Sequence, residues 1–364
     1  PWQIEGSVVA LRESGFQDLV CVQNKTVVTN AFKGEDLNHY LPIFRKYDIP
    51  VKYNFRDEDM RWIDYRPKAR MHVLPKIFPE GIRIPDYFEG KNIVHLPTVK
   101  THVFTTTTGA MKNAFGGLLN ERRHWTHPVI HETLVDLLMI QQKIHRGVFA
   151  VMDGTFAGDG PGPRCMVPHV KNVILASADQ VAIDAVAAKL MGMDPLSIKF
   201  IRLAHERGLG CGDPRDIEIV GDVDAANENW HFDGPFREMT FASRMQHKIY
   251  WGPLRKPIEW SLKTVLAPWA YIASVLYHDS FWYPFNADRR MRDALNSPWG
   301  RLFQNWETLT PDANGFPTVG EAPAVAPRLG RRALGQSVGI LGTCIKEAPE
   351  FASRRRHATP APKA

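Results

Sequence analysis

The sequence has few cysteines, and none of them has the local spacing that metal clusters use. Cys21, Cys165, Cys211 and Cys344 lie far apart, and the chain holds no C-x-x-C pair. Zinc ribbons and iron–sulfur ferredoxins bind their metals through closely spaced cysteines, so the sequence does not support either kind of cluster. We expect four reduced thiols in a protein of the cytoplasm.

The sequence also lacks a long apolar run and a strongly charged body. The apolar stretch at 264–277 is interrupted by Pro268 and is too short to span a bilayer. The formal net charge is +6, and five of these charges come from residues 321–364, where eight Lys and Arg face three Asp and Glu. Because a nucleic-acid surface needs Lys and Arg clustered on one face, the nearly neutral body predicts no nucleic-acid partner.

Strands alternate with helices over residues 1–235. The expected strands are 19–23, 92–96, 148–152, 172–176 and 217–220, and the expected helices are 4–14, 129–145, 180–191 and 196–207. This alternation predicts an α/β fold with a mostly parallel sheet covered by helices, in which ligands bind at the carboxyl ends of strands. Because the chain opens on Pro1 with a helix already in progress, we expect that the start of the domain precedes this sequence.

The C-terminal part differs in composition. Residues 236–310 are rich in aromatic and basic side chains and predict a helical appendage, and residues 311–364 predict a largely disordered basic tail. The stretch 251–285, which Pro268 should divide into two short helices, has the Trp, Tyr, Lys and Arg that a peripheral contact with a membrane surface needs. The alternative is a helical cap packed on the α/β domain.

An unusual polar stretch, TVKTHVFTTTTGAMKNAFGG, occupies residues 98–117, directly after the strand expected at 92–96. Its two ammonium groups, its four consecutive hydroxyls and the N–H groups of a helical turn that begins after Gly109 predict a site for a phosphate or carboxylate. We expect this turn to stop at Gly116 and Gly117. The expected ligand contacts are Lys100, Thr105, Thr106, Thr107, Thr108, Gly109, Lys112, Asn113 and Gly116. The spacing of a P-loop is absent, and a tightly packed turn with surface lysines is the alternative.

Histidines near this stretch supply candidate proton carriers. His102 lies within it, and His124, His127 and His131 follow it. Pro128 suits the first position of a helix, so His127 and His131 should face the same way. We expect His102 or His127 to act as acid or base with Lys112 on a bound anion, while metal ligation and ordinary surface positions remain alternatives for these histidines.

Three carboxylates complete the candidate site. Asp153 and Asp159 belong to DGTFAGDGPGP, which predicts a rigid open loop after a strand, and together they could hold Mg²⁺ or another divalent metal. Turn chemistry alone is the alternative. Asp184 lies among apolar residues of the helix at 180–191, where a carboxylate must be paired or neutral, and we expect it to hold Lys100 or Lys112. We expect Asp153 to take part in catalysis by orienting a cation or a histidine, and Asp184 to belong to the ligand-binding residues. Asp153, Asp184, His102 and His127 should converge on one cavity.

Four segments resemble, in order, the uncharacterised DUF362 family over about residues 1–222. They are NIVHLPTVKTH…TGAMKNAFGG, VMDGTFAGDGPGP, ASADQVAIDAVAAKLMG and GLGCGDPRDIEIVG. Some members of that family carry an iron–sulfur module, which the cysteines of this chain do not support. The segment Thr108-Gly-Ala-Met-Lys112 is faintly similar to the lysine loop of lactate racemases, which carries a nickel-pincer nucleotide, but it lacks the proline and one glycine.

Two classes of function fit these patterns. The first is an enzyme or cofactor-dependent protein that performs acid–base or redox chemistry on a small anionic molecule. The second is a non-catalytic protein that binds a cofactor or takes part in assembly at a membrane surface. The sequence does not identify the substrate, the cofactor or the oligomeric state.

Overall fold

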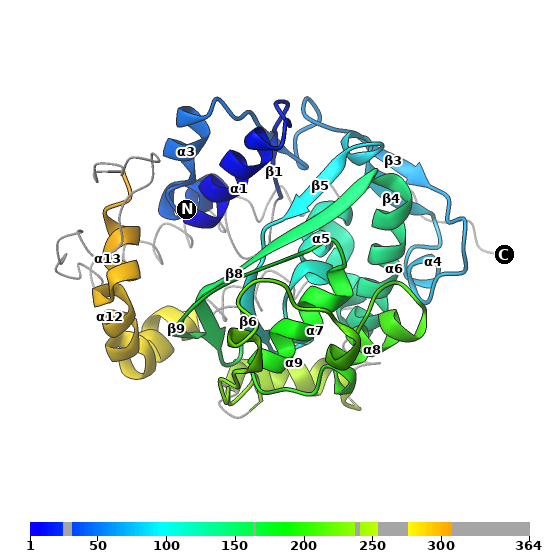
Figure 1. Ribbon diagram of the computed structural model, residues 1–364. Helices are drawn as coiled ribbons and strands as arrows, with labels where there is room; N and C mark the ends of the chain where they lie inside the picture. Colours follow the sequence, from blue (N-terminus) through cyan, green and yellow to red (C-terminus); the bar gives the residue numbers. More distant parts are fainter. Residues whose placement is uncertain (25–30, 163–164, 237–240, 254–275, 308–364) are drawn as a thin grey trace.

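The computed structural model describes residues 1–24, 31–162, 165–236, 241–253 and 276–307 (Figure 1). The central sheet contains β5 (Asn92–His95), β6 (Thr98–His102), β7 (Thr106–Thr107), β8 (Gly147–Asp159) and β9 (Val167–Ser177). Strand β8 pairs in parallel with β5 and β6, whereas β7 and β9 pair antiparallel with β6 and β8. The expected α/β fold is confirmed, with a mixed sheet built around parallel pairs.

Four helices form the main core on one side of β8. They are α5 (Ala110–Leu118), α6 (Ile130–Ile144), α7 (Gln180–Leu190) and α8 (Lys199–Glu206), and their apolar faces pack together (Figure 1). Val99 and Met152 of the sheet pack against Ile183 of α7, because alternate strand residues point to the helical side. Asp179 begins α7 by accepting hydrogen bonds from the backbone N–H groups of Val181 and Ala182.

Smaller elements cover the other regions of the sheet. Helices α1 (Trp2–Glu13), α2 (Ala31–Leu37) and α3 (Tyr40–Lys46) accompany the parallel pair of β1 (Cys21–Gln23) and β2 (Val51–Tyr53). The antiparallel pair of β3 (Trp62–Tyr65) and β4 (Ile82–Pro85) flanks α4 (Leu74–Ile77). Short 3-10 helices lie at Asp86–Phe88, Pro195–Ser197, Pro214–Asp216 and Ala225–Asn227, and the longer η2 spans Glu121–Val129. Gln3 joins α1 to the sheet by donating to the carbonyl groups of Pro97 and Val151.

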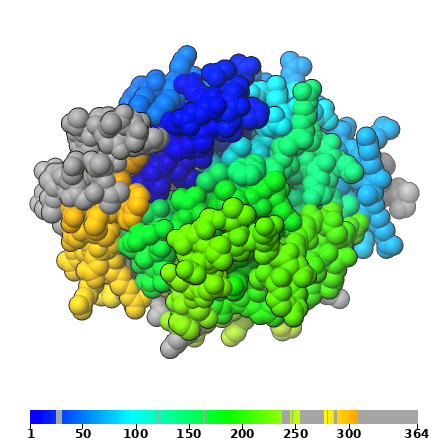
Figure 2. Space-filling model, in the orientation of Figure 1, coloured from blue at the N-terminus to red at the C-terminus, as the bar shows by residue number. Residues whose placement is uncertain are grey.

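The C-terminal region is helical, as expected. It contains α9 (Phe241–Trp251), the π-helix η6 (His278–Ala287), α12 (Asp288–Asn296) and α13 (Pro298–Gln304). The orange flank in Figures 1 and 2 is α12 and α13, which lie beside β9 and α1. The Trp299 indole donates to the Asn172 side chain at 2.7 Å, and its ring centre lies 5.0 Å from that of Trp2.

Within the described part of the chain, no helix combines the length and the hydropathy that crossing a bilayer requires. The expected kink at Pro268 and the expected disordered tail at 311–364 lie outside the described residues.

Three local expectations are wrong. Residues 153–159 are part of β8 and not an open loop, because they pair with β9; a Cβ at Gly154 would lie 2.5 Å from Val173, so this glycine serves cross-strand packing. Helix α5 continues through Gly116 and Gly117 and does not stop there. Residues 217–220 form no strand, although Ile217 packs against the core.

Candidate functional site

Cationic and imidazole side chains from four elements gather around His102. Lys100 and His102 come from β6, Lys112 from α5, His127 from η2 and His131 from the first turn of α6. The ring centre of Phe104 lies 5.7 Å from that of His102 and 5.3 Å from that of His127. We call Lys100, His102, Lys112 and His127 the cationic cluster.

Burial and neighbouring positive charges lower the pKa values of the side chains in the cationic cluster. Burial, then the nearby Lys100 and Arg123, lower the pKa of Lys112 to about 7. Burial lowers the pKa of His127 to about 4, and burial together with Lys112, His127 and Lys100 holds the pKa of His102 well below its usual range. Both histidines are therefore neutral at pH 7.

Hydrogen bonds assign complementary tautomers to the two histidines. The Nδ1 atom of His102 accepts from the backbone N–H of Phe104 at 3.1 Å, which leaves its proton on Nε2. The Nδ1 atom of His127 lies 2.9 Å from the carbonyl oxygen of His124, so Nδ1 carries the proton and Nε2 is an acceptor. The cluster thus contains one imidazole donor and one imidazole acceptor.

No carboxylate of the described residues forms an ion pair with Lys100 or Lys112. The charges that shift the pKa of Lys112 are both cations. Its ammonium group instead lies over the ring of Phe115, 5.9 Å from the centre. Partly buried ammonium groups in such surroundings favour the binding of an anion.

Aromatic residues of α9 cover the cluster, and the sequence did not indicate this role. The Tyr250 ring stacks on His127 with centres 5.7 Å apart, and Trp251 lies 5.5 Å from Phe104. Burial raises the pKa of the Tyr250 hydroxyl, as expected for a covering residue. The aromatic richness of the region was visible in the sequence, but its contact with His127 joins residues more than a hundred positions apart.

The threonines mainly build the hairpin. Thr105 donates its hydroxyl proton to the carbonyl of Thr107 at 2.7 Å, and Thr108 donates to the carbonyls of Thr98 and Lys100 at 3.3 Å. A hydroxyl has one proton to give, so these two have none left for an anion. Thr106 has a φ of 66° at the turn, and within the described structure the buried Thr107 hydroxyl finds no partner. Ligand contact by Thr106 or Thr107 stays a prediction.

Asp184 caps α5. One of its carboxylate oxygens accepts from the backbone N–H of Ala110 at 2.6 Å and the other from that of Met111 at 3.1 Å, while burial raises its pKa to about 8. Gly109, with a φ of 140°, makes the approach possible, because a Cβ there would lie 2.1 Å from the carboxylate. The expected ion pair of Asp184 with Lys100 or Lys112 is therefore wrong. Asp184 also takes two of the N–H groups that we expected a ligand to use.

The expected cation site between Asp153 and Asp159 is also wrong. They lie six positions apart along the extended strand β8, which is about 20 Å. Asp153 accepts from the Trp2 indole at 3.0 Å, and Asp159 accepts from the backbone N–H groups of Asp233 and Gly234 at 2.8 and 3.0 Å. Across the described ranges, no group of three or more His, Cys, Asp or Glu side chains is arranged to hold a metal ion. A catalytic role for Asp153 stays untested, but its contacts place it against α1.

The remaining predicted contacts have structural partners. The side-chain amide of Asn113 lies 3.1 Å from Nδ1 of His95, and the carbonyl of Gly116 accepts from the Asn54 amide at 3.1 Å. His131 stacks on Phe200, with ring centres 5.9 Å apart, and its pKa is lowered to about 4 by burial. These contacts tie all three residues to the surrounding fold.

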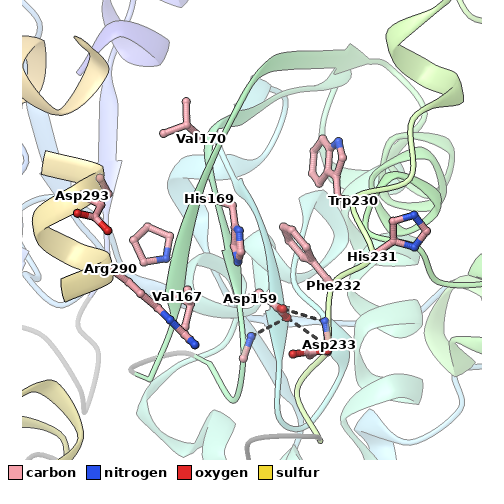
Figure 3. Close-up of a pocket in the computed structure, with 14 residues that line it drawn as sticks. Asp159, Val167, His169, Val170, Trp230, His231, Phe232, Asp233, Arg290 and Asp293 are labelled. Carbon is pink, nitrogen blue, oxygen red and sulfur yellow. Dashed lines mark hydrogen bonds between the residues drawn. The ribbon is translucent and has the colours of Figure 1, made fainter. Parts of the chain in front are cut away.

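A cavity of about 540 Å³ lies elsewhere, between β9, residues 230–234 and α12 (Figure 3). His169 and Phe232 lie side by side in its lining with ring centres 4.9 Å apart, and Arg290 and Asp293 line it from α12. Of the predicted site residues, Asp159 alone reaches this cavity. Its polar lining carries both signs of charge and does not single out one class of ligand.

Comparisons with known proteins find similarity over about half of the chain. A family model described as a domain of unknown function, DUF362, matches residues 1–189. A thylakoid-associated protein of Synechocystis sp. is 24% identical over 175 residues, which are 47% of this chain and 51% of that relative. The chain thus spans about half the length of this curated relative. No solved structure matches, and the likeness to lactate racemases gains no support.

Proposed function

The chain belongs to the DUF362 family, and we propose that its cationic cluster binds a small molecule that bears a carboxylate or phosphate group. The observation that carries this proposal is the charge of the cluster. Within the described structure, Lys100 and Lys112 share a partly buried, aromatic-lined site and have no carboxylate partner. Ammonium groups held away from water without a counter-charge cost free energy, which an anion offsets through charge-assisted hydrogen bonds.

The two histidines extend the proposal to proton transfer on the bound molecule. Nε2 of His102 is a donor and Nε2 of His127 is an acceptor, and both rings lie against Phe104. A donor and an acceptor placed side by side can give a proton to a bound molecule and take one from it, although the lowered pKa values make each imidazole a weak base. The geometry thus favours an enzyme of acid–base type over a protein that only stores an anion.

Titration calorimetry with oxalate and with pyrophosphate tests the anion site. Lys100→Ala and Lys112→Ala should each weaken binding roughly ten- to hundred-fold, because a hydrogen bond to a charged group contributes about 1.5–3 kcal/mol. Lys143→Ala removes an equal charge from an exposed position on α6 and should leave the affinity unchanged. Equal affinity of wild type and both cluster variants for an anion that binds would place the site elsewhere.

A second proposal concerns membrane contact through η6. Phe281 and Phe285 are 61% and 79% exposed, and the exposed Arg289 follows them. Aromatic rings beside a basic side chain suit the interface of an anionic membrane. The name of the thylakoid-associated relative is compatible with such a contact. We therefore propose that this chain associates peripherally with an anionic membrane surface.

Co-sedimentation with vesicles of phosphatidylglycerol and phosphatidylcholine tests this second proposal. The double variant Phe281→Ser and Phe285→Ser should bind less than wild type, since two exposed rings no longer enter the interface, and binding should weaken as salt is added. Phe16→Ser is the matched control, because Phe16 is 48% exposed in another part of the molecule. The proposal fails if the double variant sediments as strongly as the control.

A further inference from the structure

We propose that Lys112 is a nucleophile that forms a Schiff base with a 2-oxo acid, whose carboxylate Lys100 holds. This inference rests on the proposed anion site and narrows its ligand to a small carboxylate with an adjacent ketone or aldehyde. It assigns different tasks to the two lysines: Lys100 binds charge, and Lys112 reacts.

The structure holds the amine of Lys112 in a defined place. Lys112 lies in the first turn of α5, whose start is fixed by the bonds from Ala110 and Met111 to Asp184. Its Nζ atom is 5.9 Å from the centre of the Phe115 ring, and the His127 ring is 5.7 Å from the same centre. The amine and the His127 imidazole therefore share one aromatic wall.

The surroundings of Lys112 differ from those of structural lysines in this chain. Lys46 lies 2.6 Å from a carboxylate oxygen of Glu5, and Lys199 lies 2.6 Å from one of Glu132. Lys112 has Lys100 and Arg123 as its charged neighbours instead, with His102 and His127 beside it. A desolvated lysine next to another cation is the arrangement that activates an amine for attack on a carbonyl group.

The amine is unprotonated far more often than that of an exposed lysine. With the pKa of Lys112 lowered to about 7 by burial and by its cationic neighbours, about half of the molecules carry a neutral amine at pH 7. An exposed lysine with a pKa near 10.4 is neutral in roughly one molecule in a few thousand at that pH. Only the neutral amine has the lone pair that the reaction needs.

The reaction balances without an oxidant or reductant. The Lys112 nitrogen attacks the carbonyl carbon, a C–N bond forms, and the π electrons of the C=O bond move to oxygen. Nε2–H of His102 donates a hydrogen bond to this oxygen, and Nε2 of His127 carries the two protons of the nitrogen to the oxygen one after the other. The C–O bond then breaks, the oxygen leaves as water with both amine protons, and a C=N bond remains.

Borohydride trapping tests the Schiff base. The full chain is incubated at pH 7 with pyruvate or 2-oxoglutarate and then reduced with sodium borohydride, and its peptides are mapped by mass spectrometry. Reduction of the imine adds the mass of the 2-oxo acid less one oxygen atom. Lys112 should carry at least ten times more adduct than the exposed Lys91 and Lys143, and an excess of oxalate should suppress that labelling.

Two variants separate reaction from binding. Lys112→Arg keeps the positive charge, so it should bind oxalate more tightly than Lys112→Ala does, but it should lose the adduct. Lys100→Met should decrease trapping and shift its pH dependence upward, because loss of a neighbouring cation raises the pKa of Lys112. A purely structural Lys112 would show no such shift.

The results distinguish the two proposals. If oxalate binds in a way that depends on Lys112, but Lys112 is labelled no more than Lys143, the Schiff base is refuted and the anion site stands. If oxalate and pyrophosphate do not bind and Lys112 is not labelled, both proposals are overturned.

Discussion

At the scale of single residues, Asp184 shows how a buried carboxylate can organise a site without touching a ligand. It is 1% exposed, and its oxygens accept the first two backbone N–H groups of α5. Those groups form the positive end of the helix dipole, close to Lys112. Asp184 therefore satisfies the helix start and fixes the turn from which Lys112 projects.

Replacing Asp184 by alanine should destabilise the fold by about 2–6 kcal/mol, since two buried N–H donors lose their acceptor at roughly 1–3 kcal/mol each. Asp184→Asn keeps one acceptor oxygen and should cost less. Urea denaturation measures both, with the exposed Asp57→Ala as control. A stability of Asp184→Ala equal to that of the control would show that the cap contributes nothing.

At the scale of elements, the sequence predicted what depends on local periodicity. Helices α6 and α7 and the Asp179 cap follow from apolar spacing and from the preference of Asp for helix starts, and all three are present. Strand β8 beyond Met152 was missed, because its glycines are typical of a loop and its strand character comes from pairing with β9. The prediction of a strand at 217–220 was wrong in the opposite way. These β-branched residues have no partner strand and therefore form no sheet.

The residues of the candidate site also divide into those that local sequence predicts and those that only the tertiary structure brings together. Lys100, His102 and Lys112 lie within thirteen residues of sequence, so the sequence could predict that they come together. The position of Asp153 against α1 depends on which face of β8 its side chain occupies, and the contact of Tyr250 with His127 depends on the path of the chain through the C-terminal region. Both are tertiary facts that local patterns do not contain.

At the scale of the whole molecule, the cationic cluster links folding, ligand binding and pH. Unfolded Lys112 keeps its proton up to its ordinary pKa near 10.4, whereas the folded protein releases it at about pH 7. The unfolded state thus binds more protons between these values, and the contribution of Lys112 to the stability of the ligand-free protein rises with pH in this range. A bound anion favours the ammonium form and opposes this trend.

Stabilisation by oxalate should therefore be largest below about pH 7 and decrease above it, with affinity falling by up to about tenfold per pH unit. His102 and His127 are neutral throughout this range, while burial also lowers the pKa of Lys100, so its titration acts in the same direction. Thermal unfolding from pH 6 to 9, with and without oxalate, measures the effect. Lys112→Arg keeps its charge and should show a much flatter dependence. An oxalate-induced shift in Tm that is the same at pH 6 and pH 9 in the wild type would contradict a titrating amine at the anion site.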